Sequence, residues 1–145
     1  VNNRPIQQKK FNKLVGFVPQ DDDTVDPELT VNEAITFSAG LRVDRSLTNK
    51  QRQDLVERVI DDLALDTVRH QLVGSGGRDG ARGLSGGQRK RVSIALDLVP
   101  QPSCLLLDEP TTGLDSTMSA SVVGALRRVA RNGVTVVATI PQPSQ

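Results

Sequence analysis

The stretch CLLLDE, residues Cys104–Glu109, joins a continuous apolar run to two adjacent carboxylates. An apolar run of strand length is typical of a central parallel strand that is covered on both faces. The carboxylates then follow at the carboxyl edge, where open α/β sheets bind ligands. Asp108 offers the oxygen ligands that Mg²⁺ prefers, and Glu109 can polarise water for attack on a phosphoryl group. Acidic pairs at strand ends are also common as solvated caps, so this motif alone leaves both interpretations open.

The elements around this stretch predict an α/β fold. Leu14–Gln20 is interpreted as a short buried strand, and VTVVAT (134–139) as another. Between CLLLDE and VTVVAT, residues 116–131 form a helical pattern that ends at Asn132-Gly133. Strand–helix–strand at this spacing predicts a right-handed βαβ unit with a parallel-sheet core. The side chains expected to point inward from the helix are Met118, Val122, Val123, Leu126 and Val129.

Two successive helices without an intervening strand are predicted between residues about 28 and 83. Thr30 with Glu33, and Thr48 with Gln51, have the spacing of capping boxes that begin helices. We interpret this region as an α-helical subdomain inserted into the core, and the acidic run DDDTVDPE before it as a solvated linker. The expected apolar faces are Val31, Ala34, Ile35, Phe37, Ser38 and Leu41 on the first helix, and Leu55, Val56, Val59, Ile60 and Leu63 on the second.

The glycine-rich run GSGGRDGARGLSGGQ leads directly into a third helix that begins at Ser85. Backbone N–H groups and the helix dipole make such a terminus an anion site. Gly86 and Gly87 allow backbone to approach a phosphate closely. Ser85 and Gln88 also have capping-box spacing, which is the structural alternative. That alternative leaves unexplained two glycines in a first turn, where each costs helix stability.

Composition narrows the class of protein. The 145 residues suit one domain, and 37% hydrophobic with 24% charged residues is ordinary for a globular protein. A net charge of +1 and 2% aromatic residues argue against a nucleic-acid partner. The single Cys104 fits a reducing compartment, and no apolar run approaches the ~20 residues that span a bilayer. Because the sequence starts without Met, we expect a piece of a longer protein.

Two neighbouring motifs resemble those of a known family. LSGGQRKR, followed by LLLDEPTTGLDS, resembles the signature motif, Walker B strand and D-loop of ABC-type ATPases. GFVPQDD with ELTVNEAITFSAGLR, together with RKRVSIALDLV and TIPQPS, resembles subfamily G, the White/pleiotropic-drug-resistance type. The resemblance covers essentially residues 1–145 and implies a partial P-loop NTPase-type ABC ATPase domain. The sequence contains no G-x-x-x-x-G-K-[ST] motif, the main phosphate-cradling loop of that fold.

The resemblance implies ATP and Mg²⁺ as cofactors. It makes Asp108 the residue that serves the magnesium and Glu109 the catalytic carboxylate. Gln20 would be the Q-loop glutamine, which touches Mg²⁺ or the attacking water and senses the membrane domains.

The same resemblance implies that a second nucleotide-binding domain completes the site. Ser85, Gly86, Gly87 and Gln88 would face the γ-phosphate of ATP held by that partner. Asp115 would be the D-loop residue that crosses the dimer interface.

One position departs from the family pattern. Similar sequences have His-Gln-Pro-Ser where this chain has Pro141-Gln142-Pro143-Ser144. In the family pattern that histidine contacts the γ-phosphate. Proline has neither a titratable group nor an N–H, so Pro141 can neither donate a hydrogen bond to phosphate nor orient water. Either the site is impaired here, or the proline is a single-base change in the source sequence. We interpret His70, the only histidine, and the basic run Arg89–Arg91 as solvated surface.

The implied function is ATP hydrolysis that energises a subfamily-G-like membrane exporter, with this domain on the cytoplasmic side. The partners would be a second nucleotide-binding domain and the transmembrane domain of the parent protein. Two alternatives remain: a non-hydrolysing ATP-binding partner domain, which Pro141 favours, and a soluble, non-transport ABC ATPase. Without the phosphate-cradling loop, these 145 residues alone are expected to be inactive.

Overall fold

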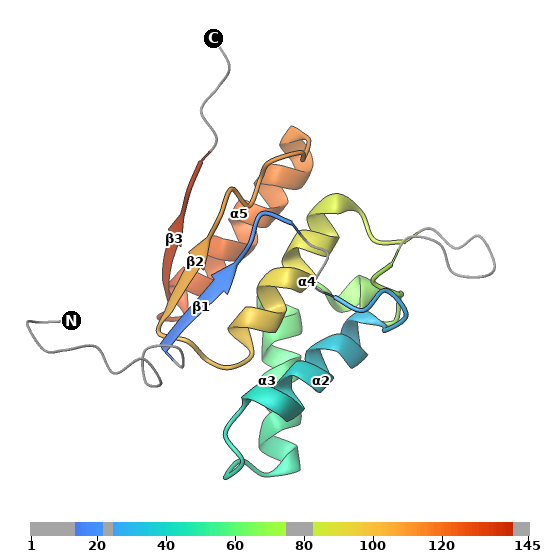
Figure 1. The fold of residues 1–145 in the computed structure, drawn as a ribbon, viewed down its shortest axis with the longest axis vertical. Coiled ribbons are helices and arrows are strands. Elements are labelled where there is room, and N and C mark those ends of the chain that lie inside the picture. Colours follow the sequence, from blue (N-terminus) through green and yellow to red (C-terminus); the bar gives the residue numbers. More distant parts are fainter. Residues whose placement is uncertain (1–13, 22–24, 75–82, 141–145) are drawn as a thin grey trace, which may run out of the picture.

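The computed structural model describes residues 14–21, 25–74 and 83–140 (Figure 1). The described chain begins with a strand, continues through three α-helices and a 3₁₀ turn, and then runs strand, helix, strand. The α/β class with an intervening helical segment is therefore confirmed. The elements in chain order are β1 (Val15–Val18), α2 (Val31–Arg42), α3 (Asn49–Asp62), the 3₁₀ turn η1 (Asp66–Val68), α4 (Gly86–Leu98), β2 (Cys104–Leu107), α5 (Ser116–Arg131) and β3 (Thr135–Ala138).

The sheet has three parallel strands in the order β1-β2-β3, so CLLL is central as predicted. Val18 pairs with Leu107, and Leu107 pairs with Ala138, so the three strands end level with one another. The residues that follow these strands therefore meet at one carboxyl edge. α5 connects β2 to β3 in a parallel βαβ unit.

In the described part of the chain, helices cover only one face of this sheet (Figure 1). Leu105 and Leu107 on that face are buried in the core, and on the neighbouring strands α4 contacts β1 and α5 contacts β3. On the other face Phe17 is 56% exposed and Val137 is 52% exposed. For the described residues, the predictions of a CLLL strand covered on both faces and of a buried VTVVAT strand are therefore wrong. The prediction of a buried strand at Leu14–Gln20 holds on one face only. The reason is that α4 and α5, which contact the sheet, lie on the same side.

The predicted capping boxes all form. Thr30 Oγ1 accepts from Glu33 N–H (3.2 Å), while Glu33 Oε2 accepts from Thr30 N–H (2.9 Å). The second bond stabilises the ionised carboxylate and lowers the pKa of Glu33. Thr48 and Gln51 repeat the arrangement at α3.

Helix α2 packs against α3 and α4 with only part of its apolar face. Val31, Ile35 and Ser38 are buried, but Phe37 is 63% exposed and Leu41 is 70% exposed. The prediction for Phe37 and Leu41 is wrong, because these two residues lie four positions apart on a stripe that no described element covers. In α3, by contrast, Leu55, Val56, Val59, Ile60 and Leu63 are all buried as predicted.

Helix α4 lies between the helical segment and the sheet and contacts α2, α3, α5 and β1. Arg42 of α2 donates to Leu96 O (2.9 Å) and pairs with Asp97 at 2.8 Å. Apolar residues from every layer form one continuous core cluster. α4 therefore packs against both the predicted helical subdomain and the sheet of the core.

Helix α5 buries Val122, Leu126 and Val129 as predicted, with Met118 half-buried. Val123 is 38% exposed, so that part of the prediction is wrong; Ala125 is buried instead, one turn from Val122 and Val129. His70 is exposed as expected. Within the described ranges, every helix is too short or too polar to cross a bilayer.

Candidate functional site

The carboxyl edge of the sheet brings together three of the predicted residues. Gln20 follows β1, and Asp108 and Glu109 follow β2. The Gln20 side-chain amide donates to Glu109 Oε2 in a long contact of 3.5 Å. Asp108 N–H donates to Val18 O at 3.0 Å, which extends the ladder one residue beyond the strands. Gln20, Asp108 and Glu109 therefore lie close together at this edge, while their roles in binding or catalysis stay predictions.

Glu109 adopts a strained backbone conformation, with φ of +42° in the left-handed region. A bulky non-glycine residue occupies that region only when its surroundings hold it there, and such residues cluster at functional sites. Glu109 N–H donates to Thr139 Oγ1 (2.7 Å), and Thr112 Oγ1 donates to Glu109 Oε2 (2.8 Å). The backbone and the carboxylate of Glu109 are thus held from two sides.

Thr139 also bonds the second carboxylate, since its hydroxyl donates to Asp108 Oδ1 at 2.9 Å. One hydroxyl therefore accepts from the Glu109 backbone and donates to Asp108. Thr139 and Thr112 were not among the predicted site residues. The position of Thr139 directly after a parallel strand was the one signal that could have identified it, because the ends of β2 and β3 meet at the same edge.

Ser85 and Gln88 form the N-terminal cap of α4, as the structural alternative required. Ser85 Oγ accepts from Gln88 N–H (3.3 Å), and Gln88 Oε1 accepts from Ser85 N–H (2.8 Å). Helix geometry leaves the first-turn N–H groups of Gly86 and Gly87 without intrahelical acceptors, so this terminus can still bind an anion.

Close packing gives Gly86 and Gly87 a second explanation, apart from a phosphate. A Cβ atom on Gly86 would lie 2.9 Å from Leu114 Cδ2, and one on Gly87 would lie 3.1 Å from Met118 Cβ. The start of α4 is therefore pressed against the segment that leads into α5. This contact accounts for both glycines whether or not a phosphate binds.

Asp115, the predicted D-loop residue, is the N-cap of α5. Its Oδ1 accepts from Met118 N–H at 2.7 Å. The side chain is exposed and lies next to Leu114, which touches the start of α4. Asp115 and Ser85 thus begin two neighbouring helices.

The basic run Arg89–Arg91 is not the solvated face that the sequence predicted. Lys90 is 3% exposed, and Arg91 is also buried. Arg91 donates to Ser121 of α5, and burial, with a smaller contribution from the Arg128 charge, lowers the pKa of Arg91. The prediction failed because α4 is packed on several sides, so positions that alternate around the helix are all covered.

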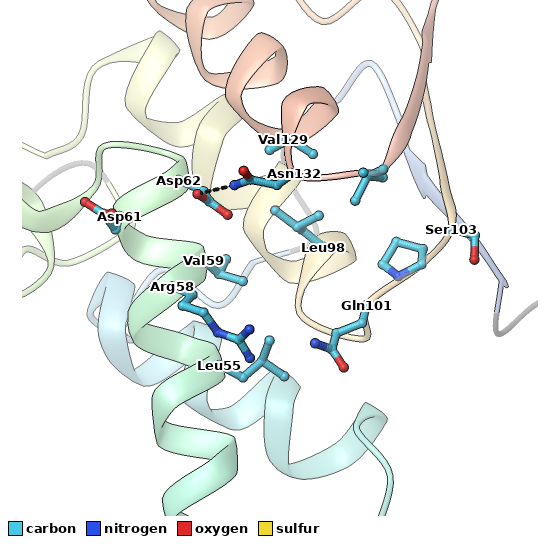
Figure 2. A pocket seen from close by; sticks show the side chains of 13 residues that line it. Leu55, Arg58, Val59, Asp61, Asp62, Leu98, Gln101, Ser103, Val129 and Asn132 are labelled. Atoms are coloured by element: carbon cyan, nitrogen blue, oxygen red, sulfur yellow. Dashed lines mark hydrogen bonds between the residues drawn. The ribbon is translucent and has the colours of Figure 1, made fainter.

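A surface cavity of about 570 Å³ lies away from the site (Figure 2). It opens between α3, the loop before β2 and the turn before β3, at the amino end of the strands. Asn132 donates to Asp62 across it at 2.8 Å, which ties α5 to α3. None of the predicted site residues lines this cavity, and ligands of parallel sheets bind at the opposite edge. The carboxyl edge is therefore the candidate functional site.

The donor set at that edge fits a partial magnesium shell. Asp108 is exposed, and both carboxylates present oxygen, the ligand atom that Mg²⁺ prefers. Within the ranges that the structure describes, no three His, Cys, Asp or Glu residues cluster as a complete metal site. A magnesium ion held there would take its remaining ligands from substrate phosphates and water. Pro141 lies outside the described residues.

Comparison with known proteins identifies the family. The family model described as "ABC transporter" matches residues 1–112. ABC transporter G family member 21 of Arabidopsis thaliana is 51% identical over 143 residues, which is 99% of this chain and 20% of the relative. ABC transporter G family member 25 of Oryza sativa subsp. japonica is 45% identical over 144 residues, 99% of this chain and 14% of the relative. The chain thus spans a fifth or less of the length of these relatives.

A solved structure agrees with the fold. The chain resembles cbiO1 from Clostridium perfringens, described as part of the ABC transporter complex cbiONQ, with a TM-score of 0.79 and 25% identity. The match covers 97% of this chain and 54% of cbiO1. The parallel sheet, the central LLLDE strand and the capped LSGGQ helix described above are the features that carry the family motifs. The chain therefore belongs to the ABC transporter family, as part of a nucleotide-binding domain of the subfamily G type.

Proposed function

We propose that this chain is the ATP-hydrolysing part of a subfamily-G-like membrane exporter, with Glu109 as its catalytic carboxylate. One observation carries the proposal: Glu109 is strained in its backbone, held by Thr112 and Thr139, and reached by Gln20, all beside Asp108. A carboxylate held in this way is preorganised to accept a proton from an attacking water. A solvated cap would need none of these constraints.

Each residue at the edge has a distinct task in this proposal. Glu109 orients the water and accepts its proton. Gln20 donates to the same carboxylate and would touch Mg²⁺ or the attacking water beside it. Asp108 holds magnesium, directly or through water. When bound, Mg²⁺ neutralises charge on the phosphate oxygens of ATP.

The predicted signature-motif residues, Ser85 to Gln88, would contact ATP that is bound to a partner domain. Ser85 and Gln88 bond to each other rather than to the Glu109 group, so the predicted site residues form two separate clusters in one chain. We propose that the first-turn amides of Gly86 and Gly87 face the γ-phosphate of ATP bound to a second nucleotide-binding domain. Asp115, exposed beside them, would cross the interface between the two domains.

The parent protein would be an integral membrane transporter, with this domain on the cytoplasmic side and in contact with its transmembrane domain. The similarity to G family transporters, and to a component of a transporter complex, supports this over a soluble non-transport ATPase. We further propose that residues 1–145 are one partial ATPase domain and that about 28–83 are its helical subdomain. The antiparallel bridge between Thr30 and Leu72 supports these limits, because it brings the two ends of the helical segment together.

The substitution Glu109→Gln tests the catalytic assignment in the parent protein. The carboxamide keeps the shape but cannot accept a proton. We expect ATP turnover to fall roughly a hundredfold or more, while ATP-bound dimers accumulate. Steady-state phosphate release and size-exclusion chromatography with ATP measure the two effects. Glu28→Gln, an exposed carboxylate in the loop before α2, is the control. Turnover near the unaltered rate would show that Glu109 is not the catalytic carboxylate.

A second candidate function is ATP binding without hydrolysis, which Pro141 favours. In the family pattern a histidine occupies this place and contacts the γ-phosphate. If only that contact is missing, Pro141→His should raise ATPase activity at least about tenfold, since one positioned donor is worth ~10²–10³ in rate in other enzymes. Purified homodimers in nanodiscs allow both versions to be assayed. An unchanged rate would favour the binding-only function.

A further inference from the structure

Lys90 of α4 donates hydrogen bonds to the backbone of the segment that carries Gln20. The residue is 3% exposed. Its Nζ donates to Gln20 O at 2.7 Å and to Pro19 O at 3.3 Å. A buried ammonium is costly unless it is hydrogen-bonded, and hydrogen bonds from a charged donor are among the stronger ones in proteins. The hydrogen bonds to these two carbonyls therefore stabilise the buried Lys90 ammonium, and they also fix the position of the two carbonyls.

The segment after β1 needs such an anchor. β1 ends at Val18, and Pro19 has no N–H with which to continue a strand ladder. The carbonyls of Pro19 and Gln20 accept instead from Lys90 of α4. These two hydrogen bonds join residues 71 and 70 positions apart in the sequence. The backbone from which the Gln20 side chain extends is thus placed by a different element of the fold.

The same Gln20 reaches Glu109. Its backbone oxygen accepts from Lys90, and its side-chain amide donates to Glu109 Oε2 at 3.5 Å. Lys90 lies one helical turn after Gly86, where α4 begins. A short chain of contacts therefore runs from the start of α4, through Lys90 and Gln20, to the carboxylate proposed to activate water.

We propose that Lys90 is a positioning residue for hydrolysis, which couples the start of α4 to Glu109 by fixing the backbone of Gln20. This inference rests on the proposed ATPase function. It assigns Lys90 no contact with ATP: Lys90 acts through Gln20. Movement of the start of α4, when it meets a partner's nucleotide, would shift the Gln20 amide relative to Glu109.

The substitution Lys90→Met in the parent protein tests this, because Met keeps an unbranched side chain without donors. We expect kcat to fall roughly tenfold, the change that about 1.4 kcal/mol produces, with KM for ATP changed less than about twofold, since no contact with ATP is lost. In a Gln20→Ala background the further loss from Lys90→Met should nearly vanish, because residues that act as a unit are not additive. Lys90→Arg, which keeps the charge and donors, should recover part of the rate.

Arg91→Met is the matched control. It removes a neighbouring buried cation of the same helix, whose guanidinium donates to Ser121 of α5 instead. Its effect on kcat should be the same with Gln20 and with Gln20→Ala. If Lys90→Met is additive with Gln20→Ala, as Arg91→Met is expected to be, Lys90 acts only through general stability and the proposal is overturned.

Hydrogen exchange gives a second result that does not depend on hydrolysis. In the nucleotide-free parent protein, Lys90→Met should speed amide exchange in a peptide that covers residues 14–21, and Arg91→Met should not. Unchanged exchange in that peptide would overturn the Lys90 assignment even if Glu109 proves catalytic. Faster exchange, together with an inactive unaltered protein, would instead refute the ATPase function while leaving the contact between Lys90 and Gln20 in place.

Discussion

At the scale of single residues, the site depends on how one strained residue is held. Glu109 sits at φ of +42°, and its N–H is satisfied by Thr139 rather than by a regular ladder. Strain of this kind costs on the order of 1–3 kcal/mol and persists only when neighbouring groups enforce it. Thr139 and Thr112 are those groups.

The substitution Thr139→Val should therefore raise the activation free energy of ATP hydrolysis by more than it lowers the free energy of unfolding. It removes the acceptor of Glu109 N–H and the donor to Asp108 while keeping the shape of the side chain. We expect kcat of the parent protein to fall roughly tenfold, which is about 1.4 kcal/mol of activation free energy. That is close to the contribution of one hydrogen bond to a charged group. Steady-state ATPase assays and thermal melts measure the two quantities.

Two variants serve as controls for Thr139→Val. Thr139→Ser keeps the hydroxyl and should retain most of the rate. Thr135→Val changes the other end of β3, away from the carboxyl edge, and should leave the rate unchanged. Equal losses for Thr135→Val and Thr139→Val would mean that β3 is merely sensitive to substitution.

At the scale of elements, α4 combines two requirements that coincide at its first turn. In the proposed function it presents first-turn N–H groups to a phosphate, and it also packs against the segment that leads into α5. Gly87 has Met118 beside it, whereas an added Cβ on Gly124 in the middle of α5 would have no atom within 4 Å apart from its own stretch of helix backbone. The same residue type is thus required at one helix position and replaceable at the other.

We expect opposite changes in stability at these two glycines. Gly124→Ala should raise the free energy of unfolding by about 0.5–1 kcal/mol, because alanine loses less backbone entropy in a helix. Gly87→Val should lower it by about 1–3 kcal/mol, because α4 and α5 must separate to accommodate the side chain. Urea denaturation of the 145-residue chain measures both. A stabilising Gly87→Val would show that packing does not require this glycine.

At the scale of the whole molecule, the predicted site residues in the described ranges lie in two clusters, one at the carboxyl edge of the sheet and one at the start of α4. The sequence has no G-x-x-x-x-G-K-[ST] loop, and the described sheet leaves Phe17 and Val137 on an open face. The strongest grip on the α- and β-phosphates in this fold comes from that loop. The carboxyl edge and the start of α4 would each contact only part of a bound ATP.

The 145 residues alone should therefore bind Mg-ATP weakly and hydrolyse none. Isothermal calorimetry on the isolated chain should show a dissociation constant above about 1 mM, which corresponds to roughly −4 kcal/mol of binding free energy. The parent protein, titrated in the same buffer, is the comparison. Submillimolar affinity of the isolated chain would contradict this expectation and would mean that the carboxyl edge suffices to hold the nucleotide.

The sequence by itself determined the features that depend on near neighbours in the chain. Capping boxes at Thr30, Thr48 and Ser85 form between residues three apart, so their chemistry is readable locally. The sequence pattern also predicted a parallel sheet. Because the carboxyl ends of parallel strands share one edge, Gln20 lies near Asp108 and Glu109 although Gln20 and Glu109 are 89 positions apart in the sequence.

Only the tertiary structure decided which side chains are covered and by what. Lys90 and Arg91 look like a solvated run, yet both are buried, because α4 has neighbours on several sides. Phe37 is apolar, yet it is exposed, because the covered stripe of α2 lies elsewhere. The link from Lys90 to Gln20 spans 70 residues, and its existence depends on how α4 packs beside β1. Contacts of this kind follow from the packing of whole elements, which no local pattern of residues specifies.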